Sequence, residues 1–197
     1  TIILKRLELI GRTCYKSEGK ITEFSCIEFV RKIIKSGHHA IIEHYDVCVR
    51  VICDRGVTHE IVRHRIASYA QESTRYCNYA SGKFENEITV IEPCFWYQNY
   101  GDIELEKYNI WKNSMIESEQ NYNKLISLGA SPQEARSVLP NSLKTEIVMT
   151  MNLREWRHFL TLRTSKTAHP QMIEVANMIL PEFKSKLPVF FENIGGN

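Results

Sequence analysis

The sequence contains no C-x-x-C pair, no glycine-rich phosphate loop and no long apolar run. Its six cysteines are spread over 197 residues, a length at which a globular core forms without disulfides. We therefore expect reduced cysteines and a cytoplasmic protein. No apolar stretch approaches the roughly 20 residues that span a bilayer, so we expect no membrane association. The first residues, TIILKRLELIGR, carry charges where a signal peptide has its apolar region.

The chain also has little net charge. Its 25 Lys and Arg residues nearly balance 23 Asp and Glu residues, which leaves a formal charge of +2. This balance argues against a nucleic-acid partner, so any anion site must come from locally clustered basic residues. The content of 43% hydrophobic and 24% charged residues is typical of globular proteins. The length suits a single domain that spans residues 1–197.

Hydrophobic spacing predicts a mixture of helices and strands. Helical spacing occurs in six segments, namely 25–36, 57–66, 102–128, the segment that follows residue 131, 153–163 and the segment from residue 170. Alternation or β-branched composition predicts strands at 45–51, 88–91 and 143–151. The order lacks a regular βαβ alternation. This pattern indicates an α+β fold in which helices cover an antiparallel sheet.

Several helix ends carry recognisable signals. Ser25 and Ser131 are each followed three residues later by Glu, which predicts a capping box at both positions. Gly37 stands where the helical segment 25–36 should end, and Gly129 stands where the segment 102–128 should end. Pro181 lies inside the last helical segment, and we expect it to bend or break that helix.

The densest polar segment runs from Arg63 to Tyr76 and reads RHRIASYAQESTRY. A solvated, basic helix end is the simplest interpretation of an Arg-His-Arg sequence. However, Arg63 and Arg65 would point to different sides of a helix, so they cannot form a single surface stripe. The segment continues through hydroxyl residues to Arg75 without an apolar period. Arginine forks and hydroxyl groups are the donors that phosphate recognition requires.

Two histidine clusters suggest a metal site, and neither fits one well. In a zinc-protease helix the second histidine follows the first by four residues, but Arg63 occupies that place after His59. His64 is displaced from His59 by about 140° around a helix. The segment Gly37–His44 contains three histidines and Glu43, but it has no neighbouring cysteine and no further clear ligand. A polar loop or a hydrogen-bonded connection between a helix and a strand is the alternative interpretation of this segment.

Four segments, taken in chain order, resemble the motifs of the flavin-dependent thymidylate synthases. The RHR-x7-S signature of that family matches Arg63 through Ser73. The other matches are GH-x4-EH at 37–44, EAR-x2-LP at 134–140, and N-x-R with F-x-x-L-R at 152–163. Each motif by itself is weak evidence for the family. The ordered set, which extends from about Gly37 to Gln171, is a strong resemblance.

This resemblance implies a twisted antiparallel β-sheet flanked by helices, in a homotetramer whose active sites are shared between subunits. It implies FAD-dependent reductive methylation of dUMP to dTMP. Methylenetetrahydrofolate would be the carbon donor and NADPH the reductant. Stabilising charge on the uracil ring would then be the catalytic task of Arg163, because a guanidinium remains charged at any working pH.

The resemblance also assigns binding residues by position. Those implied to bind FAD are His38, Arg63, His64, Arg65, Gln71, Asn152, Arg154 and His158. Those implied to bind dUMP are Glu60, Arg63, Gln71, Ser73, Arg75, Arg136 and Arg163.

Some of these positions differ from the usual residues of the family. Gln71 stands in place of Glu, and Glu60 in place of Gln. His158 replaces a common Asn and keeps a hydrogen-bonding nitrogen. Ala40 stands where Ser or Thr often contacts FAD, so only its backbone could do so, and His38 is the better candidate in that segment.

Two other functions are compatible with parts of the sequence. A flavoprotein with a different redox function would share the cofactor but would not need Ser73, Arg136 and Arg163. A nucleic-acid-binding module could use the segment from Arg63 to Arg75, although the low net charge and the lack of a known module argue against it. None of the matched positions is a cysteine, so we expect no cysteine nucleophile.

Overall fold

The computed structural model describes residues 2–82, 87–96 and 101–195. The chain forms two compact units and passes between them several times. Unit 1 comprises Thr1–Val49, His64–Ser68 and Met149–Asn197, and unit 2 comprises Arg50–Arg63 and Tyr69–Val148. The prediction of a single domain over residues 1–197 stays a prediction. No helix in the described ranges combines the length and apolar character needed to cross a membrane.

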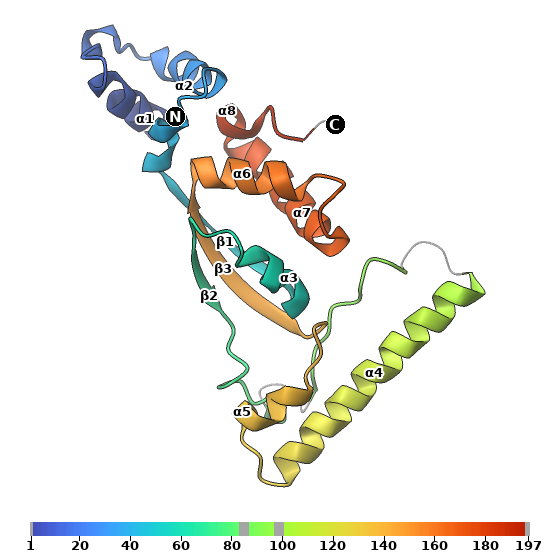
Figure 1. Cartoon of the computed structure of the whole chain (residues 1–197). Coiled ribbons are helices and arrows are strands. Elements are labelled where there is room, and N and C mark those ends of the chain that lie inside the picture. The colour runs from blue at the N-terminus through green and yellow to red at the C-terminus, as the bar shows by residue number, and fades with distance from the viewer. Residues whose placement is uncertain (1, 83–86, 97–100, 196–197) are drawn as a thin grey trace. The chain divides into compact units, whose positions relative to one another are not determined.

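Unit 1 contains most of the helices (Figure 1). They are α1 (Ile2–Thr13), α2 (Ser25–Lys35), α6 (Leu153–Arg163), α7 (Pro170–Lys186) and α8 (Pro188–Phe191), with the 3-10 helices η1 (Glu18–Lys20) and η2 (His39–His44). Its core is aromatic. Trp156 packs edge-on against Phe159 and Phe183, and Phe183 packs in the same way against Phe191. Burying these large rings holds α6 against α7 and α8.

Unit 2 contains the 26-residue helix α4 (Asp102–Ser127), which packs against the short helix α5 (Pro132–Ala135). Helix α3 (Arg55–Ile61) and the 3-10 helix η4 (Arg136–Val138) also belong to this unit. Its described core includes Tyr79, Tyr122, Ala135 and Leu143. The predicted capping box at Ser131 is confirmed, because its hydroxyl and the Glu134 carboxylate cap the start of α5 reciprocally.

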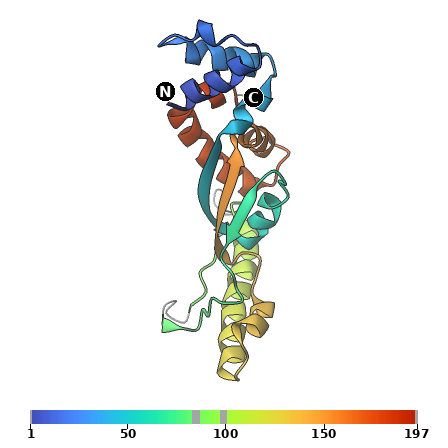
Figure 2. The same cartoon turned by 90° about the vertical axis from the view of Figure 1, so that its left-hand side faces the viewer.

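The sheet contains β1 (Asp46–Asp54), β2 (Ser68–Gln71) and β3 (Lys144–Asn152) in the order β1-β3-β2 (Figure 2). Alternate residues of β3 are buried from Thr145 to Met151, as the sequence pattern predicts. The segment predicted as a strand at 88–91 forms an isolated antiparallel bridge from Val90 to Leu143. Helices together with a small antiparallel sheet confirm the α+β class.

The helix predicted at 57–66 is wrong in its extent, because α3 ends at Ile61. Tyr69 Oη donates a hydrogen bond of 2.9 Å to the carbonyl of Ile61, which satisfies an acceptor at the end of the helix. The Arg-His-Arg segment therefore begins in a turn after the helix. Local spacing could not reveal this end, because a side chain from further along the chain caps it.

Another local prediction also fails. Ser25 does not form the predicted capping box, because its hydroxyl accepts from the Thr22 amide and donates to the carboxylate of Glu8. Of the two effects expected at Pro181, a bend or a break, the break does not occur, because helix α7 continues to Lys186. Leu180 and Phe183 are buried on either side of this proline. Their burial offsets the roughly 3 kcal/mol that a proline costs inside a helix.

Asp54 is the N-cap residue of α3, since its carboxylate accepts a hydrogen bond of 2.7 Å from the Val57 amide. We expect Asp54→Ala to lower the free energy of unfolding by about 1 kcal/mol, because the first turn loses its cap. Asp54→Asn should retain most of the stability, because Asn is an equally good cap. Urea denaturation of the three proteins measures the effect, and an equal loss in both variants would contradict the cap assignment.

Candidate active site

The predicted site residues are divided between the two units. Unit 1 contains His38, His64, Arg65, Asn152, Arg154, His158 and Arg163. Unit 2 contains Glu60, Arg63, Gln71, Ser73, Arg75 and Arg136. The first set includes most of the residues predicted to bind FAD, and the second includes most of those predicted to bind dUMP.

His64 is the centre of the polar cluster in unit 1. Arg163 Nε donates to His64 Nε2 at 3.0 Å, and His64 Nδ1 lies 3.3 Å from Glu155 Oε1. The imidazole side chain is only 4% exposed, and the Glu155 side chain is 10% exposed. Phe159 packs edge-on against the imidazole, with 4.8 Å between ring centroids. The fold thus joins the Arg-His-Arg motif to the last residue of α6, 99 positions away.

The charge state of His64 follows from these surroundings. Burial lowers the pKa of its imidazole, and the positive charge of Arg163 lowers it further, while the hydrogen bond to Glu155 opposes both effects. A guanidinium has donors and no acceptor, so His64 Nε2 must carry a lone pair to receive the Arg163 hydrogen bond. Both observations favour a neutral imidazole.

Asn152 and Arg154 stabilise the beginning of α6. Asn152 Oδ1 caps the helix by accepting a hydrogen bond of 2.9 Å from the Glu155 amide. Arg154 Nη1 lies 2.5 Å from Glu43 Oε1, and both side chains are about half exposed. Glu43 belongs to the GH-x4-EH segment, so this ion pair joins two of the predicted motifs. His38, at the start of that segment, is exposed.

The polar residues of unit 2 form three smaller groups. Gln71 Nε2 donates to Thr58 Oγ1 at 3.0 Å and to Thr145 Oγ1 at 3.5 Å, which orients its amide. Arg63 and Glu60 are separated by 3.9 Å, as an i,i+3 ion pair. The Arg63 side chain remains 73% exposed, so it is open to an anionic ligand.

The third group connects the RHR-x7-S and EAR-x2-LP segments. Arg75 Nε donates to Gln133 Oε1 of α5 at 3.0 Å, and the Arg75 amide lies 3.3 Å from Ser73 Oγ. Arg136 follows α5 directly and is exposed. Unit 2 therefore holds Ser73 and Arg75 against the segment that carries Arg136.

Glu155 is the residue that the sequence interpretation missed. The signal was present, because Glu155 follows Asn152 by three residues, which is the spacing of a helix cap with a carboxylate in the first turn. It also interrupts an otherwise apolar buried set that contains Leu153, Trp156 and Phe159. A charged residue within such a set needs a partner, and His64 is that partner.

Within the described ranges, His64, Glu155 and His158 offer ligand atoms that all lie within 4.8 Å of one another. This group is a poor cation site, because His64 Nε2 accepts a hydrogen bond from the positively charged Arg163. His59, which was considered above as the first histidine of a zinc-protease helix, is not part of this group. None of the six cysteines, all of which lie within the described ranges, forms a disulfide. Burial, together with the charge of Asp54, raises the pKa of the Cys53 thiol to about 12, so it remains protonated.

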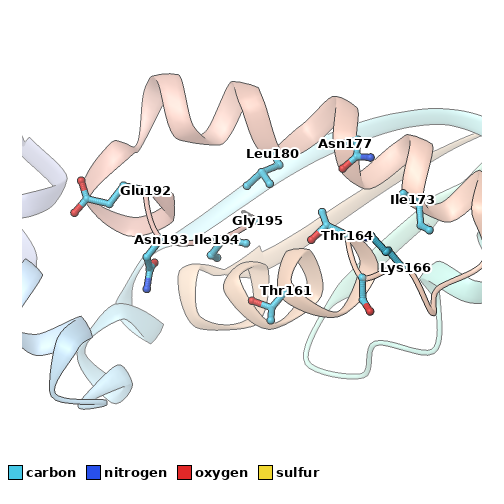
Figure 3. Close-up of a pocket in the computed structure, with 11 residues that line it drawn as sticks. Thr161, Thr164, Lys166, Ile173, Asn177, Leu180, Glu192, Asn193, Ile194 and Gly195 are labelled. Carbon is cyan, nitrogen blue, oxygen red and sulfur yellow. The ribbon is translucent and has the colours of Figure 1, made fainter. Parts of the chain in front are cut away.

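An open hollow of about 1100 Å³ lies elsewhere in unit 1 (Figure 3). Its walls come from the end of α6, from α7 and from the C-terminal segment, with Thr161, Asn177 and Asn193 among the residues that line it. None of the predicted site residues is among those that line this hollow. The residues predicted from the motifs therefore lie outside its lining.

Comparison with known proteins identifies the family. The family model described as "Thymidylate synthase complementing protein" matches residues 4–189. The flavin-dependent thymidylate synthase of Pyrococcus furiosus is 34% identical over 177 residues, which cover 89% of this chain and 70% of that relative. The enzyme of the same name from Geobacter sulfurreducens is 30% identical over 196 residues, covering 95% and 80% of the two chains. The chain therefore belongs to the family of flavin-dependent thymidylate synthases.

Proposed function

We propose that this enzyme converts dUMP to dTMP with methylenetetrahydrofolate as the carbon donor and NADPH as the reductant of its FAD. We further propose the twisted antiparallel sheet of the family and a homotetramer with shared active sites. The observation that carries the proposal is the hydrogen bond from Arg163 to the buried His64. This hydrogen bond connects Arg163, which we propose to act on the uracil ring, with the Arg-His-Arg motif, which we propose to bind FAD.

The cofactor part of the proposal rests on the donors that the chain offers. A chain without a glycine-rich loop must hold the two phosphates of FAD with side chains. Arg63 and Arg65 are both exposed and follow α3 in a segment without helical or strand structure, so their guanidinium forks are accessible to phosphate. The other residues proposed for FAD are His38, His64, Gln71, Asn152, Arg154 and His158. Bound FAD would supply the redox chemistry, and these side chains bind and orient it.

The nucleotide part rests on the polar groups of unit 2. Ser73, Arg75 and Arg136 combine a hydroxyl with two exposed or partly exposed cations, which is the donor set that a nucleotide phosphate requires. Gln71 has an amide already oriented by Thr58, which suits the recognition of a uracil edge. Glu60 and Arg63 complete the set. The Glu60–Arg63 ion pair is partly exposed and therefore weak, so a phosphate could replace the carboxylate at Arg63.

In this proposal Arg163 stabilises negative charge on the uracil ring. Its Nε is hydrogen-bonded to His64, so the plane of the guanidinium is set before substrate binds. A preorganised cation of this kind favours the anionic form of the ring without any reorganisation during the reaction.

The first prediction from this proposal concerns FAD affinity. Arg65→Ala should weaken FAD binding by roughly 10- to 150-fold, which corresponds to the 1.5–3 kcal/mol of one charge-assisted hydrogen bond. The measurement is the dissociation constant of FAD in the folded variant. Arg6→Ala removes an exposed arginine of α1 and is the matched control, which should bind FAD normally. Unchanged affinity in Arg65→Ala would place the phosphate contacts elsewhere.

The second prediction separates two roles of Arg163. If it acts on the uracil ring, Arg163→Ala should retain FAD and lower the rate of dTMP formation by roughly 10²-fold or more. The assay is single-turnover oxidation of the pre-reduced, FAD-loaded variant after dUMP and methylenetetrahydrofolate are added.

Arg163→Lys is the control for the alternative role. Arg163 is the last residue of α6, where any cation interacts favourably with the helix dipole. Lysine keeps that charge but cannot present two parallel donors, so it should restore little activity. A near-normal rate in Arg163→Ala would show that the arginine only stabilises the end of the helix.

A further inference from the structure

Arg163 does not determine the state of His64 alone, because Glu155 faces the other ring nitrogen. The Glu155 side chain is 10% exposed and its Oε1 lies 3.3 Å from His64 Nδ1. None of the motifs that led to the family includes this carboxylate. We propose that Glu155 is a positioning residue, which holds the His64 proton on Nδ1 and thereby orients Arg163. This inference rests on the function proposed for Arg163.

The argument depends on the identity of donors and acceptors. A neutral imidazole carries one proton, so one nitrogen donates and the other accepts. Ionised Glu155 can only accept, and Arg163 Nε can only donate. The observed contacts are satisfied together by the tautomer with the proton on Nδ1. In the opposite tautomer, Nε2–H would face Arg163 Nε–H, and the lone pair of Nδ1 would face the carboxylate.

The position of Glu155 keeps this carboxylate in place. It lies in the first turn of α6, where the helix dipole favours a negative charge. Its backbone amide is held by Asn152 Oδ1 at 2.9 Å. Phe159 packs edge-on against the His64 imidazole. His158, also on α6, has its ring centroid 5.9 Å from that of His64. Few rotations of the imidazole are therefore compatible with this packing.

Without the Glu155 carboxylate, the His64 proton should no longer be held on Nδ1. In Glu155→Ala nothing at that position accepts from Nδ1, so the proton can move to Nε2, which removes the acceptor for Arg163. The guanidinium would then lose its fixed plane. A misplaced catalytic group of this kind lowers rates by roughly 10- to 100-fold. Glu155→Gln should restore part of the rate, because the amide oxygen can still accept from Nδ1–H.

A double-mutant cycle tests whether Glu155 acts through Arg163. The single-turnover rate is measured in FAD-loaded wild type, Glu155→Ala, Arg163→Ala and the double variant. We expect the double variant to be no more than about 2-fold slower than Arg163→Ala, because the two residues act through one contact. Losses that multiply would overturn the inference. Glu8→Gln is the matched control, because Glu8 is a buried carboxylate of the same unit that contacts Arg12 and Ser25.

A second readout does not depend on activity. In protein with 15N-labelled histidine, the ring nitrogen shifts of His64 report which nitrogen carries the proton. We expect Nδ1–H in wild type and in Glu155→Gln, and a shift toward Nε2–H in Glu155→Ala. An unchanged tautomer in Glu155→Ala would overturn the inference, even if the rate falls. A normal rate in Arg163→Ala would instead refute the role proposed for Arg163, and the nitrogen shifts would still show whether Glu155 sets the tautomer.

Discussion

His64 can accept a hydrogen bond from Arg163 only while its own proton is on Nδ1, and the polar cluster of unit 1 depends on this condition. Residues at both ends of helix α6 contact the His64 ring and satisfy this condition. Its first turn supplies Glu155, its last residue is Arg163, and Phe159 between them packs on the imidazole. Burial of the ring favours the neutral form that the arrangement requires. One regular helix thus fixes a tautomer, a guanidinium and the middle residue of the Arg-His-Arg motif.

The two units supply different kinds of polar group. In unit 1 the central imidazole is buried and held by two partners, so its geometry is set before any ligand binds. In unit 2 the arginines that belong to the family motifs are mostly exposed. Arg75 donates a hydrogen bond to the neutral side-chain amide of Gln133. Preorganised groups suit the stabilisation of developing charge, whereas accessible arginines suit the capture of phosphate. This difference agrees with the separate roles that we propose for Arg163 and for Arg75 and Arg136.

The sequence predicted those elements whose signals are local. The 3.6-residue period of α6 and the alternation of β3 matched the structure, because each buries one continuous face. It did not predict that α3 ends at Ile61, since the capping hydroxyl comes from Tyr69. The role of Ser25 was misjudged for a similar reason, because Glu8 competes for its hydroxyl. Motifs located the arginines and His64, but only the fold could bring Glu155 to the imidazole.

The most direct test of the whole account is product formation with defined components. Folded, FAD-loaded protein is incubated with dUMP, methylenetetrahydrofolate and NADPH, and dTMP is quantified by chromatography, with each component omitted in turn. The account predicts dTMP in the complete mixture and none when any one component is omitted. If the flavin is chemically reduced beforehand, a single turnover should form dTMP without NADPH. Absence of dTMP from the complete mixture, or its formation without the folate, would contradict the account.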